Sequence, residues 1–214
     1  MLLAEQRRLL CDHGRRVVET GLVLGTSGNL SVRLGDLVAV TPGGLALDRL
    51  EPEACPVVGV GGDLVEGDLS PSSETPMHLA IYAATGTAAI VHTHSTFATV
   101  VSATLTELPP VHYNTTLLGG VVQVAGYATY GTAELAANVM TALGDRRAVL
   151  LANHGGVTLG DDLPDAFEAA RLLEWLCEVY VRARALGEPA TLTEEQLSAV
   201  VRRRQSPAFP FSED

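Results

Sequence analysis

The stretch Ile90-Val91-His92-Thr93-His94-Ser95 decides the architecture that we expect, because it combines an apolar run with two imidazoles two residues apart. Successive side chains of a β-strand point to opposite faces, so His92 and His94 leave a strand on the same side, spaced to bind one ion. Neutral imidazole is a common ligand for zinc and its neighbours, and a catalytic site usually supplies three protein ligands. Two histidines are too few for such a site. A strand with two polar residues on its solvent face is the simpler explanation of the pair alone.

The composition of the 214-residue chain is that of a globular protein, with 47% apolar and 18% charged residues. At this length we expect a single domain spanning residues 1–214. A formal charge of −11 disfavours nucleic acid and anionic lipid as partners, because both need a basic surface. No apolar segment approaches the length that spans a bilayer, and the N-terminus lacks the order of a signal peptide, so we expect a cytoplasmic protein without a membrane partner.

The local patterns predict an α/β protein in which short strands alternate with helices. Helical spacing of apolar residues, with serine, proline and glycine at the ends, predicts helices at about residues 2–22, 72–86, 96–105, 130–143, 164–186 and 191–204. Alternating or apolar runs predict strands at about residues 30–34, 37–40, 57–60, 63–66, 90–94, 111–113, 121–124 and 148–152.

A third imidazole belongs to His154, which lies in the double-glycine turn that we expect at Asn153-His154-Gly155-Gly156, where the apolar run 148–152 ends. The end of a buried strand is a usual place for functional side chains in α/β sheets. His92, His94 and His154 therefore form a credible set of three metal ligands, and Glu74 at a helix start can add a carboxylate. The remaining histidines are more readily explained as surface or core residues: His13, His78 and His112.

Seven short motifs follow one another along nearly the whole chain: Gly25-Thr26-Ser27-Gly28-Asn29, Thr41-Pro42-Gly43-Gly44, Ser72-Ser73-Glu74, His92-Thr93-His94, Tyr113, Tyr130-Gly131-Thr132 and Asn153-His154-Gly155. Together they resemble the class II aldolase and adducin family, in particular the branch typified by L-fuculose-1-phosphate aldolase. The resemblance is specific because separate motifs agree in order, whereas any one of them alone is an ordinary turn, cap or strand.

The resemblance implies a three-layer α/β/α sandwich around a mostly antiparallel sheet, assembled as a homotetramer with sites between subunits. It implies that Glu74, His92, His94 and His154 bind one Zn²⁺ per subunit, for which Mn²⁺ or Co²⁺ can substitute. The implied reaction is the reversible cleavage of a ketose 1-phosphate, L-fuculose 1-phosphate or a related deoxypentulose 1-phosphate, to dihydroxyacetone phosphate and an aldehyde. A dication that chelates the two oxygens of the resulting enediolate stabilises its charge.

The resemblance also implies roles for individual residues. Glu74 is expected to leave the metal when substrate binds and then to move a proton at the enediolate carbon. Tyr113 is expected to exchange a proton with the aldehyde oxygen, although a half-buried aromatic without a catalytic role is the alternative. Backbone N–H groups of glycine turns and helix starts suit a phosphate. The implied phosphate-binding residues are Gly28, Asn29, Gly43, Gly44, Ser72 and Ser73.

The basic residues bear independently on the chemistry, because the chain contains no lysine and all fourteen are arginines. Catalysis through a lysine imine or through pyridoxal phosphate is therefore excluded. Cys11, Cys55 and Cys177 are odd in number and widely spaced, which indicates neither a disulfide framework nor a zinc knuckle.

Two departures from the family pattern concern the substrate. Gly43 stands where the aldolase often has a hydroxyl residue, and Phe209 and Phe211 occupy a tail that can carry a tyrosine in the family. An apolar tail would suit a deoxy, methylthio or halogenated aldehyde. The alternatives of the same fold are L-ribulose-5-phosphate 4-epimerase, which usually has aspartate at the position of Glu74, and methylthioribulose-1-phosphate dehydratase. A non-catalytic assembly domain like the adducin head is disfavoured, because Glu74 and the three histidines are all present.

Overall fold

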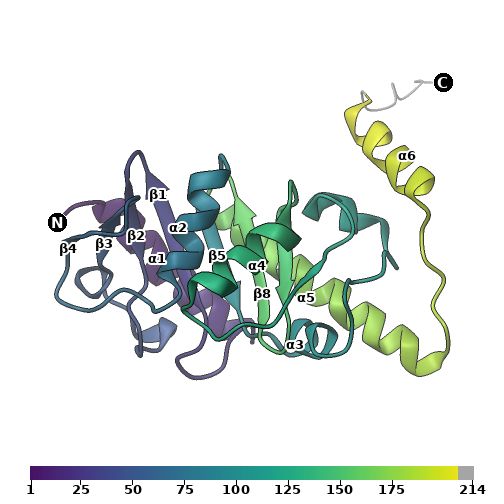
Figure 1. Ribbon diagram of the computed structural model, residues 1–214, viewed down its shortest axis with the longest axis horizontal. Helices are drawn as coiled ribbons and strands as arrows, with labels where there is room; N and C mark the ends of the chain where they lie inside the picture. Colours follow the sequence, from purple (N-terminus) through teal and green to yellow (C-terminus); the bar gives the residue numbers. More distant parts are fainter. Residues whose placement is uncertain (207–214) are drawn as a thin grey trace, which may run out of the picture.

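The protein, described over residues 1–206 by a computed structural model, is organised around one sheet (Figure 1). Its order is β4-β3-β2-β1-β5-β8-β7-β6, and every neighbouring pair is antiparallel except β6 and β7. The mostly antiparallel sheet expected from the sequence is thus confirmed. Its strands are β1 (Asn29–Leu34), β2 (Leu37–Val40), β3 (Val57–Gly59), β4 (Leu64–Glu66), β5 (Ala89–Thr93), β6 (Val124–Ala125), β7 (Ala148–Leu151) and β8 (Gly155–Gly160).

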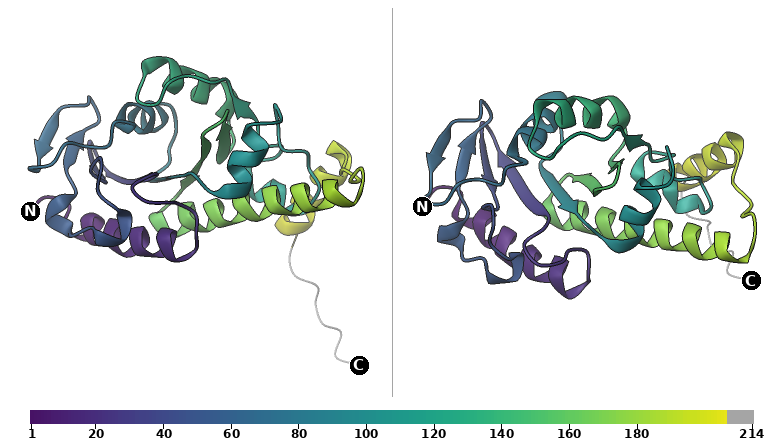
Figure 2. Two further views of the ribbon diagram at one scale, coloured as in Figure 1. Left: turned by 90° about the horizontal axis from the view of Figure 1, so that it is seen from below. Right: turned by 60° about the horizontal axis from the view of Figure 1, so that its bottom comes forward.

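Helices cover both faces of the sheet and complete the expected three layers (Figure 2). The α-helices are α1 (Ala4–Glu19), α2 (Thr75–Ala84), α3 (Thr96–Ser102), α4 (Ala133–Leu143), α5 (Leu163–Leu186) and α6 (Glu194–Gln205). The 3₁₀ helices are η1 (Leu47–Arg49), η2 (Pro52–Ala54) and η3 (Tyr113–Leu118). Helices α2 and α4 pack on one face, and α1 and α5 pack on the other. Within residues 1–206, no helix is both long and apolar enough to cross a membrane.

Strand β5 lies in the middle of the sheet and connects its two halves, because it pairs with β1 on one side and β8 on the other. All five of its residues are buried. Ile90 packs with residues of α2 and α4, whereas Val91 packs with the core beneath α1 and α5. Full burial of such a side chain contributes about 1.5–3 kcal/mol, so β5 is held firmly from both faces. The strand period places His92 on the Ile90 face, under the start of α2.

The first difference from the sequence-based expectation is strand β8, which is absent from the predicted elements. The glycines at its start were interpreted as part of a turn, yet Gly155 and Gly156 are the first residues of the strand. A Cβ atom on Gly155 would lie only 2.1 Å from the carbonyl oxygen of Thr93, so glycine lets β8 approach β5 closely. Two adjacent glycines favour a turn when only neighbouring residues are considered. The reason for glycine here is instead the contact with β5, which is distant in the sequence.

The second difference is the segment 111–113, which was expected to be a strand and instead leads into helix η3. The Nδ1 atom of His112 accepts a hydrogen bond from the backbone N–H of Asn114 at 3.1 Å. This local bond caps the 3₁₀ helix and competes with strand pairing. The expected strand 121–124 is reduced to β6, and the helices at residues 2–22 and 96–105 are shorter than expected, since α1 and α3 end at Glu19 and Ser102.

Candidate metal centre

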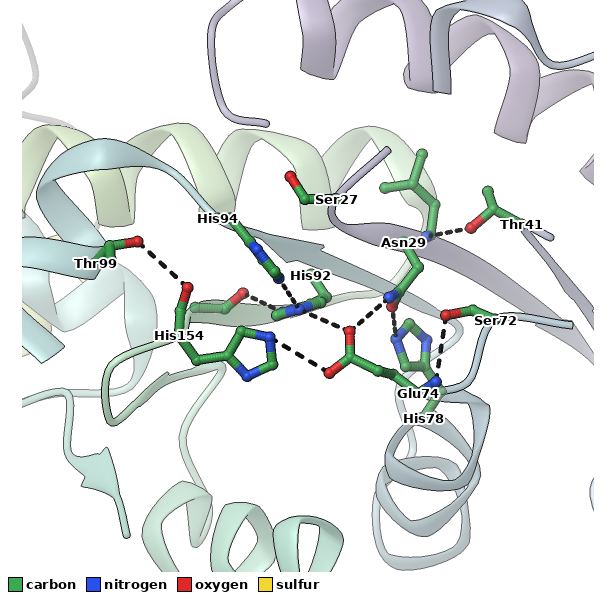
Figure 3. A network of polar contacts seen from close by, with 12 residues as sticks. Ser27, Asn29, Thr41, Ser72, Glu74, His78, His92, His94, Thr99 and His154 are labelled. Atoms are coloured by element: carbon green, nitrogen blue, oxygen red, sulfur yellow. Dashed lines mark hydrogen bonds and ion pairs between the residues drawn. The ribbon is translucent and has the colours of Figure 1, made fainter. Parts of the chain in front are cut away.

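Four side chains from separate segments meet at one end of β5 (Figure 3). Glu74 is the N-cap residue of α2, His92 belongs to β5, His94 follows that strand directly, and His154 lies in the turn between β7 and β8. One ligand atom from each of the four lies within 4.8 Å of every other. The structure therefore brings together the four residues that were predicted from the sequence to bind a metal ion, and their arrangement could hold one.

The distances within this cluster suit a small dication. His92 Nε2 lies 3.0 Å from His94 Nε2 and 3.0 Å from Glu74 Oε2, and His154 Nε2 lies 3.5 Å from Glu74 Oε1. Ligand atoms about 2.0–2.1 Å from a tetrahedral zinc ion would be about 3.4 Å apart. Glu74 Oε1 is buried and has no hydrogen-bond donor within residues 1–206. A buried carboxylate oxygen without a donor, facing imidazole nitrogens, fits the ligand set of a metal ion.

Backbone contacts orient the imidazoles of the cluster. His92 Nδ1 donates to the carbonyl oxygen of Gly156 at 3.0 Å, which leaves Nε2 facing Glu74. A hydrogen bond from the second ring nitrogen to a backbone carbonyl is the usual arrangement of a metal-binding histidine. The turn that carries His154 is held by the Thr99 hydroxyl, which donates to the His154 carbonyl oxygen at 3.3 Å. Strand β8 thus orients the His92 ring, and helix α3 holds the backbone of the turn that carries His154.

The electrostatics of the cluster favour a positive charge at its centre. Burial acts to raise the pKa of Glu74, but the nearby His92 and His154 and hydrogen bonds from His92 and Asn29 outweigh it and hold that pKa below its usual value. Burial, with repulsion from His92, lowers the pKa of His94 to about 3 and that of His154 to about 4. Burial also acts to lower the pKa of His92, but the Glu74 carboxylate outweighs it, so the net pKa is raised. Near neutral pH the site therefore offers a carboxylate and unprotonated imidazoles at His94 and His154, as metal binding requires.

Helix α2 begins where its sequence signals predict, and this start aims Glu74 at the cluster. The Ser72 hydroxyl accepts from the Glu74 backbone N–H at 3.3 Å, and the Ser72 carbonyl accepts from Thr75 N at 3.0 Å. Pro76 occupies the first turn, where its missing N–H has no helical partner to lose. Since Glu74 makes no side-chain capping bond, its carboxylate is free to point toward the histidines.

Two of the expected phosphate-binding segments lie against each other beside the start of α2. Gly43 N donates to the Ser70 carbonyl at 3.2 Å, and Ser72 N donates to the Thr41 carbonyl at 3.1 Å. Gly44 has a φ of 75°, a conformation that glycine adopts without strain. The turn with Gly43 and Gly44 therefore flanks Ser72, and through it Glu74, although the two motifs are far apart in the sequence.

The motif Gly28-Asn29 reaches the centre itself, because Asn29 is the direct partner of His92 in the pairing of β1 with β5. Gly28 has a φ of 78°, and a Cβ atom there would lie 2.8 Å from the His92 carbonyl oxygen. Only glycine allows this approach. The Asn29 Nδ2 atom donates to Glu74 Oε2 at 2.9 Å, a contact that the sequence analysis did not foresee.

Tyr113 lies apart from the four ligands within the chain. Its ring stacks on His112 with centroids 4.4 Å apart, and the guanidinium of Arg204 lies 6.0 Å from its centroid. Its side chain is 49% exposed. Within residues 1–206, no hydrogen bond, ion pair or ring contact joins Tyr113 to Glu74 or to the clustered histidines. Its catalytic role therefore stays a prediction.

Two other tyrosines, to which the sequence analysis gave no role, stand at the entrance to the centre. Tyr127 and Tyr130 line a pocket of about 250 Å³ together with His94 and His154. Both rings are largely exposed, at 67% and 66%. The sequence signal that could have found them is a pair of tyrosines three residues apart, the second of which begins the Tyr130-Gly131-Thr132 motif. Gly131 places this segment against the start of α2, since a Cβ atom there would lie 2.9 Å from the Ser73 carbonyl oxygen.

Comparison with known families agrees with this geometry. The sequence profile described as "Class II Aldolase and Adducin N-terminal domain" matches residues 8–181. The chain belongs to the class II aldolase and adducin family. The match spans the four clustered ligands and the glycine turns around them, so the resemblance of the separate motifs is confirmed.

Relatives over nearly the full length are aldolases by name. A "5-deoxy-D-ribulose 1-phosphate aldolase" of Bacillus thuringiensis serovar kurstaki is 36% identical over 206 residues, covering 95% of this chain and 97% of that protein. A "5-methylthioribulose-1-phosphate/5-deoxyribulose-1-phosphate aldolase" of Rhodospirillum rubrum is 37% identical and covers 92% and 90%. A solved "L-fuculose 1-phosphate aldolase" is similar with a TM-score of 0.92 and 38% identity, covering 96% and 99%. The chain is an enzyme of the class II aldolase family.

Proposed function

We propose that the protein is a zinc-dependent aldolase that cleaves a ketose 1-phosphate, a 5-deoxypentulose 1-phosphate or L-fuculose 1-phosphate, to dihydroxyacetone phosphate and an aldehyde. The observation that carries the proposal is the cluster of Glu74 with three imidazoles, in which one carboxylate oxygen is hydrogen-bonded and the other lacks a donor. When bound, a dication supplies positive charge beside the oxygens where negative charge develops as the carbon–carbon bond breaks. Mn²⁺ or Co²⁺ can replace zinc in such a donor set.

In this proposal Glu74 has two successive functions. Its carboxylate first completes the metal site. Once displaced by the substrate oxygens, it would move a proton at the enediolate carbon, from which the aldehyde separates. Its position at the start of α2 suits this change, because the side chain makes no capping bond that would hold it to the helix. The absence of lysine from the chain supports the same mechanism, since charge stabilisation through an imine is not available.

The phosphate is proposed to bind where the Gly43-Gly44 turn meets Ser72 and Ser73. Backbone N–H groups of a glycine turn and hydroxyls at a helix start suit a phosphate. The two segments are linked by backbone hydrogen bonds, so the site is formed before substrate arrives. Gly43 provides no side-chain hydroxyl and its N–H already donates to the Ser70 carbonyl, so we expect Gly44 and the hydroxyls of Ser72 and Ser73 to contribute correspondingly more.

Tyr113 is proposed to exchange a proton with the aldehyde oxygen from a neighbouring subunit of a homotetramer. Its exposed ring and its separation from the cluster within one chain support a site shared between subunits. The pocket beside His94 and His154 is open on the side of Tyr127 and Tyr130, which leaves room for another chain to approach.

The aldehyde end of the substrate is proposed to be apolar. The names of the two relatives, which refer to 5-deoxyribulose and 5-methylthioribulose phosphates, support this choice over a hydroxylated aldehyde. Phe209 and Phe211, the tail residues that suggested an apolar lid, lie outside the described residues.

The test is a coupled assay of dihydroxyacetone phosphate release from 5-deoxyribulose 1-phosphate, 5-methylthioribulose 1-phosphate and L-fuculose 1-phosphate, with and without chelator. We expect chelator-sensitive release, restored by zinc, with a preference for the deoxy and methylthio substrates. A clear preference for substrates that yield hydroxylated aldehydes would contradict the apolar aldehyde end. Epimerisation of L-ribulose 5-phosphate without release, or dehydration of methylthioribulose 1-phosphate, would replace the aldolase with another enzyme of the same fold.

A further inference from the structure

We propose that His78 is a positioning residue of the metal centre: it holds the Asn29 carboxamide in the orientation that donates to Glu74, and Ser31 with Tyr82 supports the His78 tautomer that this requires. The inference rests on the proposed role of Glu74 as a metal ligand. It gives a function to a buried histidine that the sequence analysis interpreted as a surface or core residue.

The hydrogen-bond chain begins at the carboxylate. Glu74 Oε2 lies 2.9 Å from Asn29 Nδ2, and Asn29 Oδ1 lies 2.6 Å from His78 Nε2 (Figure 3). An ionised carboxylate only accepts hydrogen bonds, so the amide must present its NH₂ group to Glu74. The amide oxygen then faces His78, and Nε2 of that ring must carry the proton.

The chain continues on the other side of the ring. His78 Nδ1 lies 2.7 Å from the hydroxyl of Ser31, and that hydroxyl lies 2.8 Å from the hydroxyl of Tyr82. A neutral imidazole with its proton on Nε2 accepts at Nδ1, so Ser31 donates to His78 and Tyr82 donates to Ser31. The charge on Glu74 thus sets one direction for every hydrogen bond from Tyr82 to the metal centre.

The members of this chain are held by regular structure. Asn29 and Ser31 are two residues apart on β1 and therefore lie on the same face of the sheet. His78 and Tyr82 are one helical turn apart on α2. Their relative exposures range from 0% to 3%, so water is not available as a substitute partner. Burial lowers the pKa of His78 to about 3, which keeps the ring neutral and able to accept at Nδ1.

This arrangement changes what the Asn29 side chain is expected to do. Both ends of its carboxamide are engaged, one by Glu74 and one by His78, so we infer that it acts on the metal ligand rather than on phosphate. Without the His78 donor the amide is free to rotate, and its oxygen would then repel the carboxylate. Partners that orient a metal ligand from behind typically account for 10- to 100-fold in metal affinity.

The test measures the Zn²⁺ dissociation constant of the metal-free protein by competition with a chromophoric chelator, together with the rise in Tm when zinc is added. His78→Leu is expected to bind zinc about 10- to 100-fold more weakly than the unmodified protein. His78→Gln, whose amide can still donate to Asn29, is expected to restore most of the affinity. Ser31→Ala, which removes one neutral hydrogen bond, is expected to lose about 3- to 10-fold.

The matched control is His13→Leu, because His13 is also a buried helical histidine with two hydrogen-bond partners, Leu9 and Arg16, but lies outside the cluster. It is expected to lower Tm with and without zinc while leaving the zinc affinity unchanged. If the role of His78 were purely structural, His78→Leu and His13→Leu would both lower Tm and both leave the zinc affinity unchanged. That result would contradict the proposal.

Other outcomes overturn the proposal as clearly. Zinc affinity of His78→Leu within twofold of the unmodified protein would refute it, as would equal weakness of His78→Gln and His78→Leu. Should His78→Leu fail to fold, Ser31→Ala and His78→Gln still decide, since an unchanged zinc affinity of Ser31→Ala would refute the chain. If His78→Leu is inhibited more weakly by inorganic phosphate but keeps its zinc affinity, Asn29 acts on the phosphate and not on the metal ligand. If the unmodified protein binds no zinc, both the proposed function and the role of His78 fail. If it binds zinc but His78→Leu binds zinc equally well, only the role of His78 fails.

Discussion

The metal centre and the Tyr113 region carry the two halves of the proposed chemistry, yet the fold builds them in opposite ways. Glu74 and His92 are 5% and 0% exposed and come from the start of α2 and the middle of the sheet. Tyr113 is 49% exposed and lies on η3, supported by His112 and Arg204. The groups that would hold an ion are thus assembled within one chain, whereas the proposed proton donor is presented on the surface.

The difference has a physical reason. An ion gains most from ligands whose positions are fixed before it binds, and central strands provide such positions at no further entropic cost. A proton donor that acts on one face of a bound substrate needs only to arrive at that face. A neighbouring subunit can supply it if the site is open, as it is beside Tyr127 and Tyr130.

The largest expected effect is the loss of the metal itself. His92→Ala removes the central ligand and is expected to reduce aldolase activity at least about 10³-fold, with little zinc retained after purification. Zinc analysis and the assay of dihydroxyacetone phosphate release measure the two effects. His13→Ala serves as the control, and full zinc content in His92→Ala would show that the buried cluster is not the metal site.

Glu74→Gln separates the two functions proposed for the carboxylate. The amide has the same shape but is a poor base, so kcat is expected to fall by about 10²- to 10⁴-fold. Zinc is expected to stay bound through the three imidazoles, with reduced affinity. The measurement is kcat at saturating zinc, and an unchanged kcat would rule out a proton-transfer role for Glu74.

Tyr113→Phe tests the surface half of the comparison. Removal of the hydroxyl is expected to lower kcat about 10²-fold, the usual size of one proton-transfer contribution, while zinc affinity and Tm remain unchanged. If the hydroxyl works across an interface, subunit exchange between Tyr113→Phe and Glu74→Gln should restore activity, because some mixed sites then contain both groups. Absence of any recovery in mixed oligomers would contradict a site shared between subunits, and an unchanged kcat of Tyr113→Phe would place Tyr113 outside the site.

Zinc removal should affect stability as well as activity. An ion present at about 100 times its dissociation constant stabilises the folded state by about 2.7 kcal/mol. For a chain of this size that corresponds to about 5–10 °C in Tm. Calorimetry with and without chelator measures the shift. The same Tm in both conditions would mean that no ion binds the folded protein in preference to the unfolded chain, which would contradict the metal site.

The smallest expected effect concerns the contacts of α6 with η3. Arg204 donates to Thr116 Oγ1 at 2.6 Å and to Asn114 Oδ1 at 3.0 Å, but all of these groups are solvent-accessible. Arg204→Ala is expected to change the free energy of unfolding by no more than about 0.5 kcal/mol. Chemical denaturation measures it. A much larger loss would show that α6 supports the Tyr113 region more firmly than its exposure suggests.

Much of the candidate centre could be predicted from local sequence. The two-residue spacing in β5, the apolar run before His154 and the helix-start signals around Glu74 are local patterns, and each names a side chain that lies in the cluster. His94 is one residue beyond the end of β5, yet its ring still reaches the cluster together with His92.

Other features could not be predicted, because their cause lies in another part of the chain. Gly155 was interpreted as a turn residue although it begins β8, since only the backbone of Thr93, about sixty residues earlier, demands a glycine there. His112 ends an expected strand through one bond to Asn114, which a pattern of apolar residues does not reveal.

Local sequence patterns identify which residues could bind an ion and exclude lysine chemistry, because ligand type, strand period and helix signals are properties of short segments. The partner of each of these residues follows only from the tertiary structure. Asn29 meets Glu74 and His78 only because β1 pairs with β5 in the register that places Asn29 opposite His92, while α2 packs on the same face. Register and packing are set by the whole core, so the hydrogen-bond chain behind the metal centre appears only in the folded molecule.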